Sequence, residues 1–554
     1  MDPLQRLVRR PLSAFLILVG VYALCSLLVN PGGYLGADTG AKVYTLEVME
    51  RENSWNPDIG YWAEDLDPSG ELHPVYQTRL RDDGSWVAVT TLPMLELAYP
   101  LYRVGGYPAT LAIPIVAGAM AAVAARSVAR RVRPTTDGWA TFWVVGLASP
   151  VLVYSLDLWE HGAGLAAMTG AVAILLGTLD ERPWWTAAFA GALLGLAAVM
   201  RNEAFVYTLV VVGVVCVEHL RARRKLLTPI LVGSAVVVGF AVPWAANVVL
   251  ESGFEGPSRG SRATGRVSTV ASTQLVDELG QRAREGMQTL VGLVSGDPTT
   301  SVLLGGAVVA AVVAAWRAER RADRTFALVC VGAAGAVYLA DALGGLGFVP
   351  GLLVAFPIAV AGLLADVRNP RENVVVVMAV VALPIVYLFQ YLDAAGPQWG
   401  GRYSLTSGIL LGVIGMGALA SRHPLVPRAL VGLSLAITML GFAWLIQRSH
   451  GVDEFFGDLE EVAEPVLIAR QGFILREGGA AGVGKPWLST DSEAEFSSAV
   501  DLARESGADR FSVLEWKGAA PPESAIPADA TEVDRWALDF VGTPIGIVTY
   551  EFEP

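Results

Sequence analysis

Apolar residues along this chain come in repeated runs that are separated by polar segments. Each run is roughly 18 to 24 residues long, which is enough for a helix to cross about 30 Å of hydrocarbon. The pattern predicts thirteen membrane-spanning helices. They are expected at about residues 11–30, 107–125, 138–156, 162–179, 184–200, 203–219, 227–250, 301–316, 325–344, 348–365, 374–391, 404–420 and 427–446.

The polar segments differ in length and in charge. Three are long: residues 31–106, residues 251–300 and everything beyond about 447. When the spans alternate in direction, these three segments share one side of the membrane. The opposite side then receives nearly all the basic clusters, at the N-terminus, Arg126–Arg133, Glu218–Lys225 and Arg317–Arg324. Because basic loops stay in the cytoplasm, we expect a cytoplasmic N-terminus and three extracytoplasmic segments.

One apolar stretch does not fit this alternation as a full span. Leu92–Tyr102 carries Pro93, Glu96 and Pro100, and a span there would move Arg126–Arg133 to the outer side. The stretch is therefore predicted to be a re-entrant or interfacial helix.

Composition agrees with a multi-pass protein of the plasma membrane. Hydrophobic residues make up 53% of the 554 residues and charged residues 17%, whereas soluble proteins carry about 25% charge. The formal net charge of −13 argues against nucleic acid as a partner. No small-x-small cleavage site precedes Pro31, so the first apolar run is expected to be a retained span rather than a signal peptide.

The last hundred residues have a different pattern. Residues 465–470, 510–516 and 545–552 are typical of strands, and 491–506 has the apolar periodicity of a helix. The predicted fold class is thus an α-helical polytopic membrane protein with a small C-terminal α/β domain on the extracytoplasmic side. The predicted domains are a transmembrane domain over 1–446, with outer loops at 31–106 and 251–300, and the α/β domain over 447–554.

The first long segment begins with an acidic residue just beyond the first span. Asp38 precedes Thr39–Glu52, which has the pattern of an amphipathic helix lying along the membrane surface. Further on, Tyr76–Thr90 alternates around Arg81–Ser85, a hairpin signal. Asp38 allows two interpretations: a helix N-cap, or a catalytic base at the membrane surface.

Other polar residues lie at the predicted outer ends of spans. Asp157-Leu-Trp-Glu-His161 follows the third span, so Glu160 and His161 are candidates to orient an acceptor or bind a cation. The alternative is a polar turn with Trp159 in the interfacial aromatic belt. Arg201 and Glu203 lie between two apolar runs; either they form a structural ion pair or they contact a substrate.

A late segment, Pro397-Gln-Trp-Gly-Gly-Arg-Tyr403, precedes the twelfth predicted span. Its glycines would let the backbone approach a ligand, and Arg402 could bind a lipid phosphate through two hydrogen bonds. The alternative is anchoring at the membrane interface. The candidate substrate-binding residues here are Gln398, Trp399, Arg402 and Tyr403.

These features together resemble the glycosyltransferase C superfamily, whose members include protein O-mannosyltransferases, aminoarabinose transferases and mycobacterial arabinosyltransferases. The shared features are one span, a first outer loop with Asp38 and a juxtamembrane helix, many further spans, a Trp-Glu-His turn and a Gly-x-Arg-Tyr segment. The resemblance implies transfer of a sugar from a polyprenyl-phosphate donor to a cell-envelope glycan or glycolipid acceptor on the extracytoplasmic face of the membrane. It implies an inverting displacement with Asp38 as the base.

Rival functions remain open from the sequence. A flippase or other transporter of envelope lipids has comparable hydropathy, although it does not need so much polar mass on one side. An oligosaccharide ligase or polymerase would share the topology but use different site residues. Asp65-Leu-Asp67 matches the metal-binding Asp-x-Asp pattern but lies beside a turn sequence, so no metal or other cofactor is predicted. Arg259, Arg262 and Arg266 are expected to lie in a solvated loop, and the alternative is a mobile clamp for a phosphate.

The alternation of the spans can be tested with single cysteines and a membrane-impermeant maleimide. A cysteine placed within Arg126–Arg133 should be labelled only after the membrane is permeabilised, and one within 251–300 should be labelled in intact cells. Labelling of the first site in intact cells would overturn the thirteen-span arrangement.

Overall fold

The structure is a computed structural model, and it describes residues 9–553 with gaps. The longer gaps are at 254–271, 293–297, 318–348 (apart from three single positions), 390–398 and 517–525. Short gaps lie at 76–77, 82, 89–90, 181, 223–225, 368, 463 and 491. The chain divides into two compact units. We call them the bundle unit (1–25, 113–249 and 257–444) and the loop–tail unit (26–112, 250–256 and 445–554).

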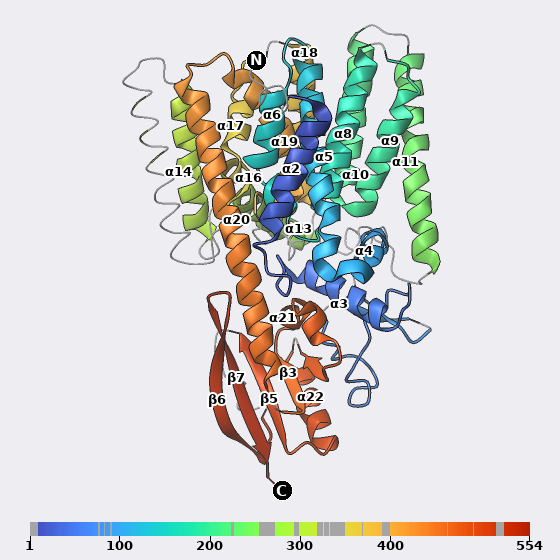
Figure 1. The fold of residues 1–554 in the computed structure, drawn as a ribbon, viewed down its shortest axis with the longest axis vertical. Coiled ribbons are helices and arrows are strands. Elements are labelled where there is room, and N and C mark those ends of the chain that lie inside the picture. The colour runs from blue at the N-terminus through green and yellow to red at the C-terminus, as the bar shows by residue number, and fades with distance from the viewer. Residues whose placement is uncertain are drawn as a thin grey trace. The chain divides into compact units, whose positions relative to one another are not determined.

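The bundle unit consists of helices (Figure 1). Seven helices of the described residues are long and apolar enough to cross a membrane, and shorter apolar helices accompany them. The elements are α2 (Pro11–Ser26), α5 (Ala112–Val132), α6 (Trp139–Leu147), α7 (Val151–Tyr154), α8 (His161–Leu179), α9 (Thr186–Met200), α10 (Glu203–Arg221), α11 (Leu227–Gly253), α13 (Ser272–Val291), α14 (Pro298–Arg317), α16 (Leu352–Ala355), α17 (Pro357–Leu363), α18 (Pro370–Phe389), η1 (Arg402–Ser404), α19 (Leu405–Leu419) and α20 (Leu425–Glu460).

Twelve of the thirteen predicted spans coincide with described helices, and the range 325–344 lies almost wholly outside the described residues. The predicted span at 107–125 is displaced, because α4 (Leu92–Thr110) ends at Thr110 and α5 then runs from Ala112 to Val132. Two spans are interrupted, between α6 and α7 and at Phe356 before Pro357. At the break between α6 and α7, the Ala148 carbonyl accepts a hydrogen bond from the Ser434 hydroxyl. Backbone polar groups inside a membrane need such partners, because no water is present there.

Three segments that the alternation assigned to one side meet in the structure. Asp180, at the C-terminal end of α8, pairs with Arg131 at 3.3 Å and with Arg371 at 2.6 Å. The Asn369 side chain donates to the Val132 carbonyl at 2.8 Å. These contacts place three predicted inner loops at one end of the bundle unit. Their cytoplasmic location stays a prediction.

The loop–tail unit joins the first polar segment to the C-terminal residues. Its elements are α3 (Ala37–Arg51), α4, β1 (Thr78–Leu80), β2 (Trp86–Ala88), β3 (Val466–Ala469), α21 (Gly472–Arg476), η2 (Gly479–Gly482), β4 (Trp487–Ser489), α22 (Glu493–Glu505), β5 (Arg510–Trp516), β6 (Ala530–Phe540) and β7 (Thr543–Phe552). Helix α20 enters this unit at Leu445. The sheet order is β4-β3-β5-β7-β6, with β3 parallel to β4 and β5 and the other pairs antiparallel.

The sheet has two buried faces because residues along a strand alternate in direction. Val466 and Ile468 of β3 lie in one core with Phe496 and Val500 of α22. Leu467 lies in the other core, with the end of α20. The C-terminal α/β domain is therefore confirmed, although the short strand β4 and the exposed edge strand β6 were not predicted.

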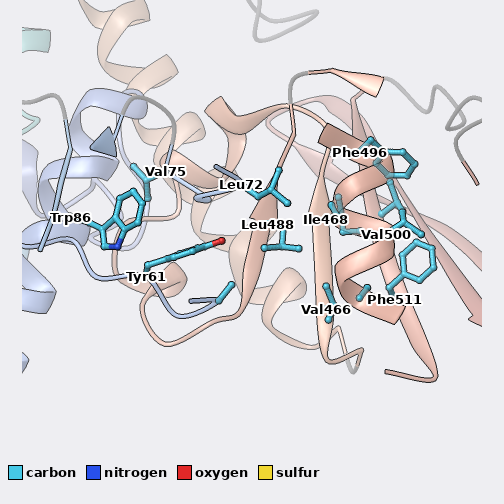
Figure 2. Close-up of a cluster of buried hydrophobic side chains, with 14 of the residues drawn as sticks. Tyr61, Leu72, Val75, Trp86, Val466, Ile468, Leu488, Phe496, Val500 and Phe511 are labelled. Carbon is cyan, nitrogen blue, oxygen red and sulfur yellow. The ribbon is translucent and has the colours of Figure 1, made fainter. Parts of the chain in front are cut away.

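The first of these cores is shared with residues 41–88. Figure 2 shows Tyr61, Leu72, Val75 and Trp86 in the same buried cluster as Val466, Ile468 and Phe496. Burying large apolar side chains contributes roughly 2 kcal/mol each, so neither segment completes this core alone. The structure thus groups residues 26–112 with the tail, whereas the sequence had placed 31–106 with the spans.

Two expectations for the first loop have different outcomes. The predicted hairpin is present as the β1–β2 pair, closed by the Arg81 amide donating to the Ser85 carbonyl at 2.9 Å. The predicted amphipathic surface helix is wrong: α3 is buried on nearly all sides from Thr39 to Met49. The tail elements α21 and η2 cover it, together with α4.

His73 makes the loop–tail unit sensitive to acid. Its Nδ1 accepts from the Val75 amide at 3.0 Å, so the ring is neutral with its proton on Nε2, which donates to the Gly60 carbonyl at 2.9 Å. Burial lowers the pKa of His73 from 6.5 to about 4. Between these values the unfolded chain binds more protons than the folded one, so stability present above pH 6.5 is lost as the pH falls towards 4.

We predict that this histidine contributes a loss of up to about 3 kcal/mol in unfolding free energy between pH 7.5 and pH 4. Thermal unfolding of the detergent-solubilised protein at several pH values measures it. The variant His73→Gln should unfold with a smaller acid dependence in that window. An unchanged dependence would show that other groups are responsible.

Candidate active site

The polar residues predicted at the ends of spans 3, 5 and 12 meet in the bundle unit. Glu160 and His161 open α8, Arg201 follows α9, Glu203 opens α10, and Arg402 and Tyr403 lie in η1 just before α19. All of them except Glu160, together with apolar residues of α8 and α10, line a small, partly open pocket. The pocket lies at the end of α8 opposite Asp180, about 28 Å away for a helix of this length.

Arg201 lies between two carboxylates. Its guanidinium is 3.0 Å from Glu203 and 3.4 Å from Glu160, and all three side chains are at most 11% exposed. The sequence left open an Arg201–Glu203 pair or a substrate contact. The structure contains that pair and adds Glu160 to it.

Arg402 lies against aromatic rings. Its guanidinium is 4.6 Å from the ring centre of Tyr403 and 5.7 Å from that of Trp159, and the residue is 7% exposed. The Tyr403 ring is also 5.4 Å from the Arg201 guanidinium, so one ring contacts both cations. Such contacts hold a cation in place at about 0.5–2 kcal/mol each.

The aromatic residues near the pocket are buried within the protein. Trp159 is 3% exposed, and its ring is 4.4 Å from His161 and 5.4 Å from Tyr154. Trp399 is 1% exposed. The alternatives that placed Trp159 in an aromatic belt, and Trp399 with Arg402 as interface anchors, are therefore wrong. His161 is 2% exposed and belongs to this aromatic cluster.

The double glycine before Arg402 has a structural reason. Gly400 and Gly401 both have positive φ, at 67° and 63°, a conformation in which other residues are strained. A Cβ on Gly400 would lie 2.4 Å from Pro150, and one on Gly401 would lie 2.5 Å from the Thr289 carbonyl oxygen. These glycines thus pack against protein just before Arg402. Their approach to a ligand stays a prediction. Gln398 lies outside the described residues, as do Arg259, Arg262 and Arg266.

Asp38 belongs to the loop–tail unit. The N-cap of α3 is Gly36, without a side-chain hydrogen bond, so the N-cap interpretation of Asp38 is wrong. Asp38 lies in the first helical turn, where a carboxylate interacts favourably with the helix dipole. Its side chain is 43% exposed and 3.5 Å from the Arg476 guanidinium.

The Asp-x-Asp segment forms hydrogen bonds within the first loop. The Asp67 carboxylate is buried and accepts hydrogen bonds from the Tyr61 hydroxyl and the Leu72 amide, each at 2.9 Å. Among the described residues, no group of three His, Cys, Asp or Glu side chains is placed to bind a metal. Asp67 thus fixes the turn that carries Leu72 into the shared core.

Sequence reasoning missed two buried cations next to Asp38. Lys42 lies one turn later on α3 and is 1% exposed. Arg476 comes from the tail, more than 400 residues away, and its side chain is 4% exposed. The signal for Lys42 was present, since only four lysines occur in the chain. No sequence pattern connected Arg476 to the first loop.

Replacing Arg201 should destabilise the bundle unit strongly. Arg201→Gln leaves two buried carboxylates without their cation. Such a change typically lowers the free energy of unfolding by about 3–5 kcal/mol. The triple variant Arg201→Gln, Glu160→Gln, Glu203→Gln should recover most of that loss, because no charge is then buried. Thermal unfolding in detergent measures both. If the triple variant is no more stable than the single one, the charges are not the cause.

No protein-family model matches the chain, and no curated protein matches it in sequence. Solved structures with a similar arrangement include the oligosaccharyltransferase of Archaeoglobus fulgidus in complex with zinc and sulfate, with 12% identity, a TM-score of 0.48, and coverage of 90% of this chain and 67% of that one. The same protein tethered to an acceptor peptide matches with 11% identity, a TM-score of 0.46, and coverage of 90% and 68%. ArnT from Cupriavidus metallidurans in the apo state matches with 13% identity, a TM-score of 0.43, and coverage of 96% and 97%.

Proposed function

We propose that this protein is a membrane glycosyltransferase that moves a sugar from a polyprenyl-phosphate donor to a glycan or glycolipid of the cell envelope. The observation that carries the proposal is the pocket of the bundle unit, where Arg402 and Arg201 line one wall at the end of an apolar helix. Buried charge in a membrane bundle is costly and usually marks a functional site. The resemblance seen in the sequence supplies the reaction class.

Arg402 is the residue assigned to the donor phosphate. A guanidinium donates two parallel hydrogen bonds to phosphate oxygens, which a lysine ammonium cannot do. The rings of Trp159 and Tyr403 fix the plane of the group. In the reaction the bond between the sugar and the phosphate breaks, and the lipid phosphate gains negative charge. An arginine already in place stabilises that charge without rearrangement.

Arg201 and Glu203 line the pocket, and Glu160 pairs with Arg201. Their mutual pairing balances the charge of Arg201 within the protein. The carboxylates of Glu160 and Glu203 are hydrogen-bond acceptors, which suits contact with sugar hydroxyl groups. The proposal therefore gives them a role in binding the sugar.

Asp38 is assigned as the general base. The acceptor hydroxyl attacks the anomeric carbon, its proton passes to the Asp38 carboxylate, and the polyprenyl phosphate leaves from the opposite face. One displacement of this kind inverts the configuration of the sugar. The position of Asp38 at the first turn of α3, partly exposed, leaves the carboxylate accessible to an acceptor.

Asp38→Asn should lower sugar transfer by about 10²–10⁴-fold, the usual contribution of a general base. The assay uses membranes with radiolabelled polyprenyl-phosphate mannose and arabinose and follows label in envelope glycans. Surface expression of the variant should match the wild type. Wild-type transfer by Asp38→Asn would exclude the base assignment.

Arg402→Gln should lower kcat by about 10²–10³-fold, because the leaving phosphate loses its cation. Arg402→Lys should also be impaired, since lysine keeps the charge but not the paired hydrogen bonds. The same membrane assay measures both. Full activity of Arg402→Lys would show that a point charge is sufficient and that the paired geometry is not used.

The acceptor can be identified by mass spectrometry of envelope glycans from a deletion strain. The proposed enzyme predicts one missing sugar or branch on a mature glycan. A transporter predicts instead accumulation of an intact lipid-linked precursor on the cytoplasmic side.

A further inference from the structure

We infer that the C-terminal α/β domain is a positioning element for Asp38, and that Arg476 is the residue through which it acts. This inference rests on the proposed role of Asp38 as a base. All the contacts that support it lie within the loop–tail unit. They involve the residues that precede and begin α3.

The residue that caps α3 is a glycine. Gly36 provides no side-chain cap, and Gly36 itself is in an extended conformation. The amides of Thr39 and Gly40 donate back to the Gly36 carbonyl, but nothing in the capping residue fixes the entry of the chain. A side-chain cap normally stabilises a helix start by about 1 kcal/mol. The first turn, which carries Asp38, therefore depends on contacts from elsewhere.

Two arginines of the C-terminal part supply such contacts. The Arg476 Nε donates to the Ala37 carbonyl at 3.2 Å, and its terminal nitrogen lies 3.5 Å from the Asp38 carboxylate. The Arg448 Nε donates to the Leu35 carbonyl at 2.9 Å, and Arg448 also pairs with Glu477. The Arg476 side chain thus contacts both the backbone just before Asp38 and the Asp38 carboxylate.

Arg476 is itself held rigidly. It is the last residue of α21, and its two predecessors, Ile474 and Leu475, are at most 1% exposed in the second core of the sheet. The guanidinium side chain is 4% exposed. Its position is therefore set by the packing of the domain and does not depend on solvent.

The helix and the tail approach each other closely next to this contact. A Cβ on Gly40 would lie 2.2 Å from the Arg476 carbonyl oxygen and 2.7 Å from the Glu477 Cα. One turn later, the Tyr44 hydroxyl donates to the Gly482 carbonyl at 2.8 Å. Backbone contact at Gly40 and the hydrogen bond at Tyr44 fix the axis of α3, and Arg476 fixes its first turn.

Displacing a catalytic group lowers the turnover rate of the enzyme more than its affinity for the substrate. A shift of about 1 Å can cost on the order of 100-fold in turnover, while donor binding through other residues is retained. Arg476→Gln should therefore lower kcat by about 100-fold with little change in the KM for the donor. Arg476→Lys keeps the charge near Asp38 but cannot reach both acceptors in one plane, so its kcat should be intermediate.

The test compares five variants of the chain in membranes, with radiolabelled polyprenyl-phosphate mannose and arabinose as donors. They are Asp38→Asn, Arg476→Gln, Arg476→Lys, the double variant Asp38→Asn with Arg476→Gln, and the control Arg510→Gln. Arg510 forms an exposed ion pair with Glu551 in the same domain, at 3.2 Å, and its loss should leave kcat unchanged. If Arg476 acts through Asp38, the double variant is no slower than Asp38→Asn alone.

Hydrogen exchange gives a second readout that does not require turnover. Amides of residues 37–41 should exchange faster in Arg476→Gln, while amides of β5 and β7 keep the wild-type rate. Unchanged exchange at residues 37–41 would overturn the inference. So would wild-type kcat in Arg476→Gln when Asp38→Asn is inactive. Full activity of Asp38→Asn would instead refute the proposed base, and the exchange data would still decide whether Arg476 fixes this turn.

Discussion

The bundle unit depends on charge balance in an apolar surrounding. Arg201 is enclosed by Glu160 and Glu203 where α8, α9 and α10 begin or end, and each helix contributes one member. A buried ion is costly unless it is paired and hydrogen-bonded. The three helix ends must therefore meet for any of the charges to be tolerated. Arg402 and Tyr403 line the same pocket as Arg201 and Glu203, so charged and aromatic side chains from several helix ends share its wall.

The loop–tail unit depends on a different constraint, the completion of a hydrophobic core. Residues 41–88 contribute one half of the cluster around Ile468, and the C-terminal sheet contributes the other. Within this unit, the side chains of Arg448 and Arg476 contact the turn that carries Asp38. The C-terminal domain packs directly against α3, the helix whose first turn carries the proposed base.

Local and periodic features were predictable from the sequence. The spans, the β1–β2 hairpin, α22 and the strands β3, β5 and β7 follow from apolar spacing, because that spacing reflects which face of an element is buried. The pocket residues were also found, because a charge next to an apolar run is conspicuous. What could not be predicted depends on distant pairing. The burial of α3 depends on elements of the C-terminal tail. The contact of Asp38 with Arg476 joins residues 438 positions apart, and no local pattern encodes such a contact. Likewise, Gly400 and Gly401 suggested a ligand, but only the structure reveals Pro150 and Thr289 against them.

The shared core also has a consequence for biosynthesis. Tyr44 and its partner Gly482 are 438 residues apart, and synthesis at about 5–20 residues per second separates their appearance by about 20 to 90 s. During that interval the first loop has left the translation machinery without the apolar surface that will cover it. Exposed aromatic residues such as Trp86 must then be kept from aggregating until the sheet arrives. The order of synthesis therefore leaves the apolar side chains of this loop uncovered until the C-terminal sheet has been made.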